Sequence, residues 1–240
     1  MAKVREQQVM RTRERILNAS AELFADRGYA ATSVNDILTL AAEDGEGMSP
    51  GRLYQQFPNK KAIAREIIAR TLTMEGVRDQ TSRLQEWVDT GLILSHRFQL
   101  RDPYGRRLRD GVGLRAALRL SLDPAMDEDY GEPWAAWLDI TTGQLAKAQL
   151  NNELLPYAEP ATFARQLAGY WAGLALVGHG LDKNHDRFEQ DISTLYGNLL
   201  TNLAIPALIP RIDVSDTRGR SLWERHQQEQ EAHEPMTPGI

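Results

Sequence analysis

The sequence contains no cysteine, which excludes disulfide bonds, thiolate metal sites and cysteine nucleophiles. Long apolar runs are also missing, since no stretch approaches the roughly 18 residues of a membrane-spanning helix. The first residues are polar where a signal peptide would be apolar. We therefore expect a cytoplasmic protein with no membrane partner, whose 42% apolar residues suffice for a buried core.

Signatures of catalysis are scarce as well. The five histidines show no metal-ligand spacing such as His-Glu-x-x-His, and no glycine-rich phosphate loop occurs. We expect no catalytic residue, no metal and no cofactor. The sequence thus favours a binding protein over the competing class, an enzyme.

The formal net charge of −5 is unevenly distributed. Residues 1–75 hold 11 Lys and Arg against 10 Asp and Glu, and the remaining residues hold 17 against 23. The acidity therefore lies in the C-terminal part. A basic arm at the start can neutralise phosphates, or it can be an ordinary solvated terminus; its residues are Lys3, Arg5, Arg11, Arg13 and Arg15.

Apolar residues recur at helical spacing along most of the chain, and no stretch alternates like a strand. Glycine and proline breakers predict about nine or ten helices joined by short turns. The expected fold is all-α, with a three-helix helix-turn-helix DNA-binding domain and basic arm at residues 1–60. A helical bundle follows at residues 61–210, and residues 211–240 read as a flexible tail.

One segment carries most of the functional information. Ser33 can cap a short helix and form a capping box with Asp36. A second short helix then begins at Ser49 and Pro50 and carries polar side chains on one face, as a helix that enters a DNA groove does. We expect contacts to base edges and phosphates from Thr32, Ser33, Ser49, Gly51, Arg52, Tyr54, Gln55 and Lys60. For Tyr54 the alternative is a core aromatic.

These residues resemble the TetR family of one-component repressors. The resemblance covers about fifty residues and includes Ala21-Glu22-Leu23-Phe24 and a recognition segment with Ser49, Gly51, Leu53, Tyr54, Phe57 and Lys60. It implies a repressor bound to double-stranded operator DNA as a homodimer. The candidates for the interface between subunits are Gly169, Ala172, Gly173 and Gly178 with Leu195, Leu199 and Leu203. The alternative for the small residues is packing within one subunit.

The turn between the two short helices departs from the family pattern. It is about five residues longer than usual, and the insert around Glu43-Asp44-Gly45-Glu46-Gly47 is acidic. Carboxylates beside a DNA-reading helix would repel phosphate if they faced it. The alternative, which we favour, is a loop that bulges into solvent.

The C-terminal part resembles the γ-butyrolactone receptor branch of the family in segments such as Trp137-Leu138-Asp139-Ile140-Thr141-Thr142 and Glu153-Leu154-Leu155-Pro156. This implies that residues 61–210 form a ligand-binding and dimerisation domain, and that a lactone-like or butenolide signal releases the repressor. The expected ligand-binding residues are Trp134, Trp137, Thr141, Tyr170 and Trp171. A multidrug-efflux regulator with a promiscuous apolar pocket, or a relative that does not bind the lactone, remains an alternative.

Overall fold

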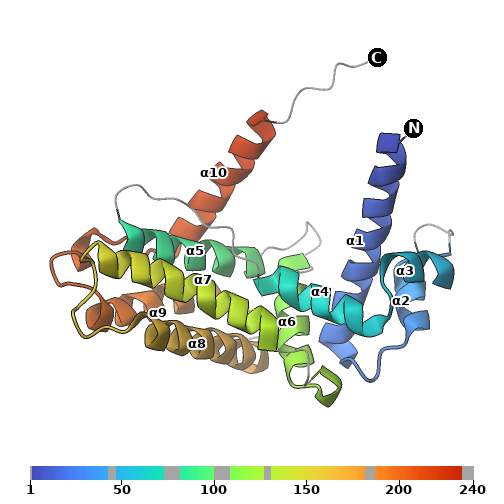
Figure 1. Cartoon of the computed structure of the whole chain (residues 1–240), viewed down its shortest axis with the longest axis horizontal. Coiled ribbons are helices and arrows are strands. Elements are labelled where there is room, and N and C mark those ends of the chain that lie inside the picture. Colours follow the sequence, from blue (N-terminus) through green and yellow to red (C-terminus); the bar gives the residue numbers. More distant parts are fainter. Residues whose placement is uncertain are drawn as a thin grey trace. The chain divides into compact units, whose positions relative to one another are not determined.

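The computed structural model describes residues 2–42, 47–72, 82–99, 109–126, 131–181 and 187–233. Within these ranges the chain forms ten α-helices, two short 3₁₀ helices and no strand (Figure 1). The expected all-α fold is confirmed. The helices are α1 (Ala2–Arg27), α2 (Val34–Leu40), α3 (Pro50–Gln56), α4 (Lys60–Leu72), α5 (Arg83–Gln99), α6 (Arg109–Ser121), α7 (Gly131–Leu150), α8 (Pro160–Leu181), α9 (Phe188–Leu203) and α10 (Arg218–His233).

The chain divides into two compact units. Unit 1 comprises Met1–Thr73 and Leu100–Trp137, and unit 2 comprises Met74–Gln99 and Leu138–Ile240. This division differs from the expected boundary at residue 60, because α4 and α6 pack with α1 in unit 1. A Cβ added at Gly113 of α6 would lie 2.7 Å from Thr71 Oγ1 of α4, so these two helices approach closely.

Unit 1 has its apolar core between the first four helices. Phe24 of α1, Ile37 of α2 and Leu53 of α3 are fully buried, and Phe57 closes the end of α3. α1 is much longer than the helices that it supports, and its residues 5–11 are exposed.

Two arginines of the expected basic arm hold the ends of the short helices. Arg15 donates to Ala41 O, the carbonyl of the residue that caps α2, at 3.0 Å. Arg13 donates to Gln56 O at the end of α3 at 2.8 Å, stacks over the Phe57 ring and pairs with Glu66. The last carbonyls of a helix lack partners within the helix, and cations stabilise them. The expectation that Arg13 and Arg15 contact phosphates is therefore corrected, whereas Arg5 and Arg11 are exposed.

Unit 2 is built around α5, most of whose side chains are buried. The carboxylate of Glu153, just after α7, accepts from the backbone N–H groups of Arg83 and Leu84 at 3.1 and 2.6 Å and so caps the start of α5. The Gln144 side chain of α7 donates to Thr90 Oγ1 at 3.0 Å. Residues late in α7 thus lie beside residues early in α5, and the two helices run antiparallel.

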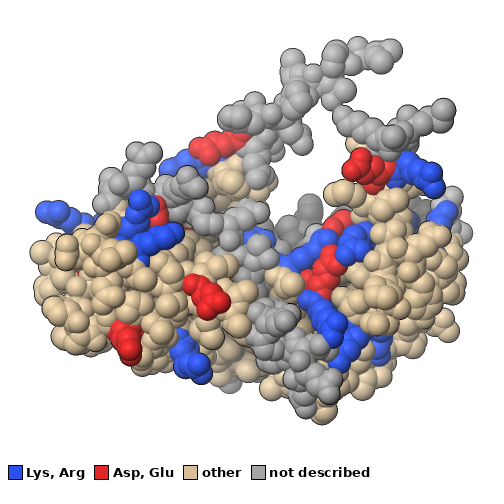
Figure 2. Space-filling view, in the orientation of Figure 1, with Lys and Arg blue, Asp and Glu red and all other residues tan. Residues whose placement is uncertain are grey.

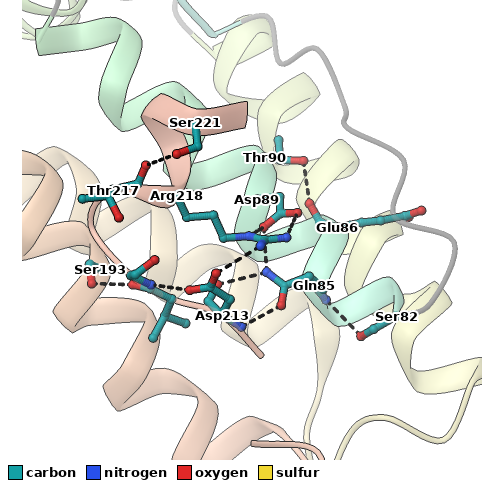
Figure 3. Close-up of polar contacts among 12 residues, drawn as sticks. Ser82, Gln85, Glu86, Asp89, Thr90, Ser193, Asp213, Thr217, Arg218 and Ser221 are labelled. Atoms are coloured by element: carbon teal, nitrogen blue, oxygen red, sulfur yellow. Dashed lines mark hydrogen bonds and ion pairs between the residues drawn. The ribbon is translucent and has the colours of Figure 1, made fainter. Parts of the chain in front are cut away.

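Residues 211–240, expected to be a flexible tail, contain α10, which packs against α5. Leu222 is buried, and a Cβ added at Gly219 would lie 2.2 Å from Leu92 O. Figure 3 shows the polar side of this contact, where Arg218 of α10 reaches Asp89 of α5. The helix gains its stability from tertiary packing, which the polar sequence does not reveal.

None of the helices in the described part of the chain is long and apolar enough to cross a membrane.

Candidate functional site

The turn from α1 into α2 is held by side chains that the sequence singled out. Ser33 Oγ accepts from Asp36 N at 3.1 Å, and Asp36 Oδ2 accepts from Ser33 N at 2.8 Å, so the expected capping box is present. Hydrogen bonds from the Ser33 side chain and backbone lower the pKa of Asp36. Thr32 is 1% exposed and its hydroxyl donates to Gly28 O at 2.8 Å. Its hydroxyl therefore has a structural partner, and the expected DNA contact of Thr32 is corrected.

The second short helix, α3, presents a polar outer face. Ser49 Oγ accepts from Arg52 N at 3.4 Å, and Pro50 takes the first helical position, as expected. Leu53 is buried, whereas Arg52 and Gln55 are exposed and Tyr54 is 52% exposed. The exposed ring of Tyr54 rules out the alternative of a core aromatic.

The loop before α3 has the Gly-x-Ser-x-Gly spacing of a hydrolase nucleophile elbow from Gly47 to Gly51. In an elbow the serine follows a strand, but here Ser49 caps a helix. A Cβ added at Gly51 would meet only Ser49 Oγ, at 4.0 Å, so no neighbouring element crowds this position. The pattern is thus a helix start with an open approach. The acidic residues of the insert, Glu43, Asp44 and Glu46, lie outside the described residues.

The side chain of Lys60, expected to contact a phosphate, is hydrogen-bonded within the protein. Its Nζ donates to Tyr29 O at 2.8 Å and to Thr32 O at 2.7 Å, and it lies 4.0 Å from the centroid of the Tyr29 ring. Burial lowers the pKa of Lys60. Since an ammonium group has three donors, two are used to hold the turn before α2. Lys60 is therefore a structural residue with at most one donor left for a phosphate.

In the C-terminal part, two of the expected ligand residues lie one turn apart on α7. Trp137 is 4% exposed and Thr141 is 1% exposed. The Thr141 hydroxyl has no hydrogen-bond partner among the described residues, although a buried hydroxyl nearly always has one. Trp134, one turn earlier, is half-buried. The inner face of α7 thus offers an apolar surface with a polar group in need of a partner.

The two aromatic residues expected from α8 diverge. Trp171 is buried and packs edge-on against Phe98 of α5 and Phe188 of α9, with ring centroids 5.8 and 5.4 Å away. Tyr170 is 51% exposed. Adjacent residues of a helix point about 100° apart, so the two side chains cannot share a face. The expectation that Tyr170 lines an internal site is corrected.

The same interior contains aromatic residues that sequence reasoning missed. Trp87 of α5 is 1% exposed and meets Tyr196 of α9 edge-on, with centroids 4.8 Å apart. Burial raises the pKa of Tyr196 far above its ordinary value. The indole N–H of Trp87 has no acceptor among the described residues. The apolar spacing of Leu84, Trp87 and Val88 in α5 was the signal that could have placed Trp87 in the core.

The outer side of unit 2 has a different composition. Figure 2 shows a largely uncharged surface over α7 and α8. Ile140, Tyr170, Leu176 and Val177 are exposed, and a Cβ at Gly169 or Gly173 would meet nothing within 4 Å. By contrast, Leu199 and Leu203 of α9 are buried within the subunit. The expected contribution of Leu199 and Leu203 to a subunit interface is corrected, whereas Leu195 is half-buried and α8 keeps an open apolar face.

Candidate metal ligands do not gather anywhere in the described ranges: no group of three or more His, Cys, Asp or Glu side chains could hold an ion there.

Comparisons with known proteins agree with this geometry. The family described as bacterial regulatory proteins, tetR family, matches residues 16–67, which contain the capped helices α2 and α3. The A-factor receptor protein of Streptomyces griseus is 26% identical over 220 residues, 89% of this chain and 73% of that protein.

Two solved structures extend the match to the whole fold. The tylp TetR regulator of Streptomyces fradiae has a TM-score of 0.75 at 28% identity and covers 89% of this chain and 96% of its own. A γ-butyrolactone receptor described as ArpA-like shares the fold with a TM-score of 0.61 at 22% identity, covering 91% of this chain and 98% of its own. Residues 16–67 thus match the tetR family of bacterial regulatory proteins, and over most of its length the chain is similar to the A-factor receptor protein and to the tylp TetR regulator.

Proposed function

We propose that this regulator is a cytoplasmic homodimeric repressor that a small neutral signal, a γ-butyrolactone or butenolide, releases from its operator. The observation that carries the proposal is the buried Thr141 hydroxyl, which lacks a partner among the described residues and lies one turn from the buried Trp137. A ligand acceptor would satisfy that hydroxyl. The similarity to a protein named A-factor receptor supports a signal of the lactone class.

The buried charges of unit 2 argue for a neutral ligand. The buried carboxylates of unit 2 already have partners: Glu153 accepts from the start of α5, Asp89 from Arg218, and Glu86 from Arg83. The buried polar atoms in need of a partner are instead neutral donors, among them the Thr141 hydroxyl and the Trp87 indole N–H. Such donors suit the carbonyl and ether oxygens of a lactone, and they give no counter-charge to a cationic drug.

Operator binding is assigned to the exposed face of α3. Arg52 and Gln55 are placed to read base edges, and Tyr54 is placed to contact a phosphate. Arg5 and Arg11, on the exposed start of α1, add phosphate contacts. The proposed partner for the open apolar face of α7 and α8 is a second copy of the chain, because one short reading helix contacts few base pairs and paired half-sites multiply affinity.

The experiment is operator release. A duplex selected from random sequence by the protein is titrated with a synthetic γ-butyrolactone and with a butenolide. The proposal expects operator affinity to fall by about five- to 150-fold, the usual range for coupled sites. If neither compound changes operator affinity or tryptophan fluorescence, while a hydrophobic cation does, the chain is a regulator of another class of ligand.

A further inference from the structure

We propose that Arg119 of α6 is a positioning residue that couples α6 to the turn between α1 and α2, so that a change in α6 alters the helices that read DNA. The proposal rests on the DNA-binding function of the family and not on the identity of the ligand.

The contact is made with backbone carbonyls. Arg119 Nη1 donates to Ala25 O at 3.1 Å and to Asp26 O at 2.8 Å, in the last turn of α1. The last carbonyls of a helix receive no hydrogen bond from an N–H group of that helix, and the negative end of the helix dipole favours a cation. A side chain of the same chain, about ninety positions further along the sequence, thus caps the end of α1.

The same side chain covers the turn itself. Gly28 has a φ of +84°, which glycine adopts readily and other residues adopt at a cost. A Cβ at this position would lie 3.2 Å from Arg119 Nε. The guanidinium therefore lies over the first residue of the turn, and five residues later Ser33 caps α2.

α4 holds this turn through a different residue. Lys60 Nζ donates to Tyr29 O and Thr32 O, so the turn is attached to α4, whereas the end of α1 just before it is attached to α6. α4 and α6 pack closely where Gly113 faces Thr71. In the sequence, α6 is also the helix between α5 and α7, most of whose residues belong to unit 2. A displacement of α6 must therefore pull on the turn or break the Arg119 hydrogen bonds.

Arg115 supplies a matched control. It lies one turn before Arg119 on α6 and donates to Asp26 Oδ1 at 2.8 Å. The Asp26 side chain is 66% exposed, and exposed ion pairs contribute little. Loss of Arg115 removes the same charge from the same helix without freeing the backbone carbonyls.

The test uses linkage in the reverse direction, because two coupled sites affect each other equally. Hydrogen exchange of the α6 amides is measured on the full-length protein with and without a duplex selected by the wild type. The proteins compared are wild type, Arg119→Gln, Arg119→Lys and Arg115→Gln. Operator affinity and thermal unfolding are measured for each protein.

In the wild type and in Arg115→Gln, operator should slow α6 exchange by at least about fivefold. In Arg119→Gln the slowing should fall below about twofold, while operator affinity stays within about threefold, and Arg119→Lys should be intermediate because it restores one charged donor. Undiminished slowing in Arg119→Gln overturns the proposal. So does joint loss of folding and operator affinity in Arg119→Gln and Arg119→Lys, which would make Arg119 a structural residue. A wild type that selects no duplex contradicts the DNA-binding function itself.

Discussion

Arg218 donates to both carboxylate oxygens of Asp89, from Nε at 2.5 Å and from Nη2 at 2.8 Å, and this fork joins α10 to α5. Asp89 is 1% exposed, so water cannot solvate its charge if Arg218 is removed. Gln85 donates to the same carboxylate at 2.6 Å and exchanges hydrogen bonds with the backbone of Asp213 (Figure 3). The C-terminal helix is therefore an integral part of unit 2.

The first prediction concerns this pair. Arg218→Ala leaves a buried carboxylate without its cation and should lower the free energy of unfolding by about 3 kcal/mol. Urea unfolding monitored by circular dichroism measures the loss. Arg220→Ala is the control, because Arg220 is 56% exposed and lies 3.7 Å from Glu189. Equal and small losses in both variants would mean that α10 contributes little to the stability of unit 2.

Asp213 gives a pH prediction. Burial raises the pKa of Asp213, but hydrogen bonds from Ser215 and Arg218 outweigh this and hold the pKa below its ordinary value of 3.8. A group with a depressed pKa stabilises the fold above its unfolded pKa and loses that contribution as the pH falls through its folded value. Asp213→Asn should therefore be less stable than wild type at pH 6, and the difference should shrink below pH 3.8. A stability difference that grows on acidification would contradict the assignment.

A third prediction tests the contact between α5 and α9. A Cβ at Gly91 would lie 1.8 Å from Tyr196 Oη and 2.5 Å from its Cζ. Gly91→Ala should lower the free energy of unfolding by about 1–3 kcal/mol through overpacking. Adding Tyr196→Phe removes the nearer atom and should recover part of that loss. Additive losses in the double variant would mean that the two residues do not touch.

The basic residues of unit 1 should divide into three classes. Arg11→Ala should weaken binding to every duplex and reduce the salt dependence by about one unit without changing stability. Lys60→Ala should lower the melting temperature as well, because Tyr29 O and Thr32 O lose their donor. Arg52→Ala should cost about 1–3 kcal/mol at one base pair of the operator. Gel shifts over a salt series with matched thermal melts separate these outcomes.

The local features of unit 1 could be predicted from the sequence because their causes are local. Ser33 and Ser49 cap helices because a hydroxyl at that position reaches the backbone two or three residues on. The roles of Arg13, Lys60 and Arg119 could not be predicted, because a carbonyl acceptor at a distant helix end leaves no pattern in the sequence. α10 was missed for a related reason: Arg218 and Gly219 bind α5 through an ion pair and a close backbone approach, and neither produces an apolar stripe.

The proposed ligand site shows where periodicity helps and where it does not. Trp137 and Thr141 were grouped correctly on one face of α7, and both are buried. Tyr170 and Trp171 are neighbours in the sequence, so composition alone could not tell which of them faces inward.

The substitution Thr141→Val tests most directly whether Thr141 binds the signal. Val keeps the shape of the side chain and removes the hydroxyl that lacks a partner, so the free energy of unfolding should rise by about 1 kcal/mol. Operator affinity without ligand should stay unchanged, and the butyrolactone concentration needed for half release should rise about tenfold, since about 1.4 kcal/mol of ligand binding is lost. A Thr141→Val protein that is less stable than wild type and is released at the same butyrolactone concentration would contradict the assignment of Thr141 to the signal.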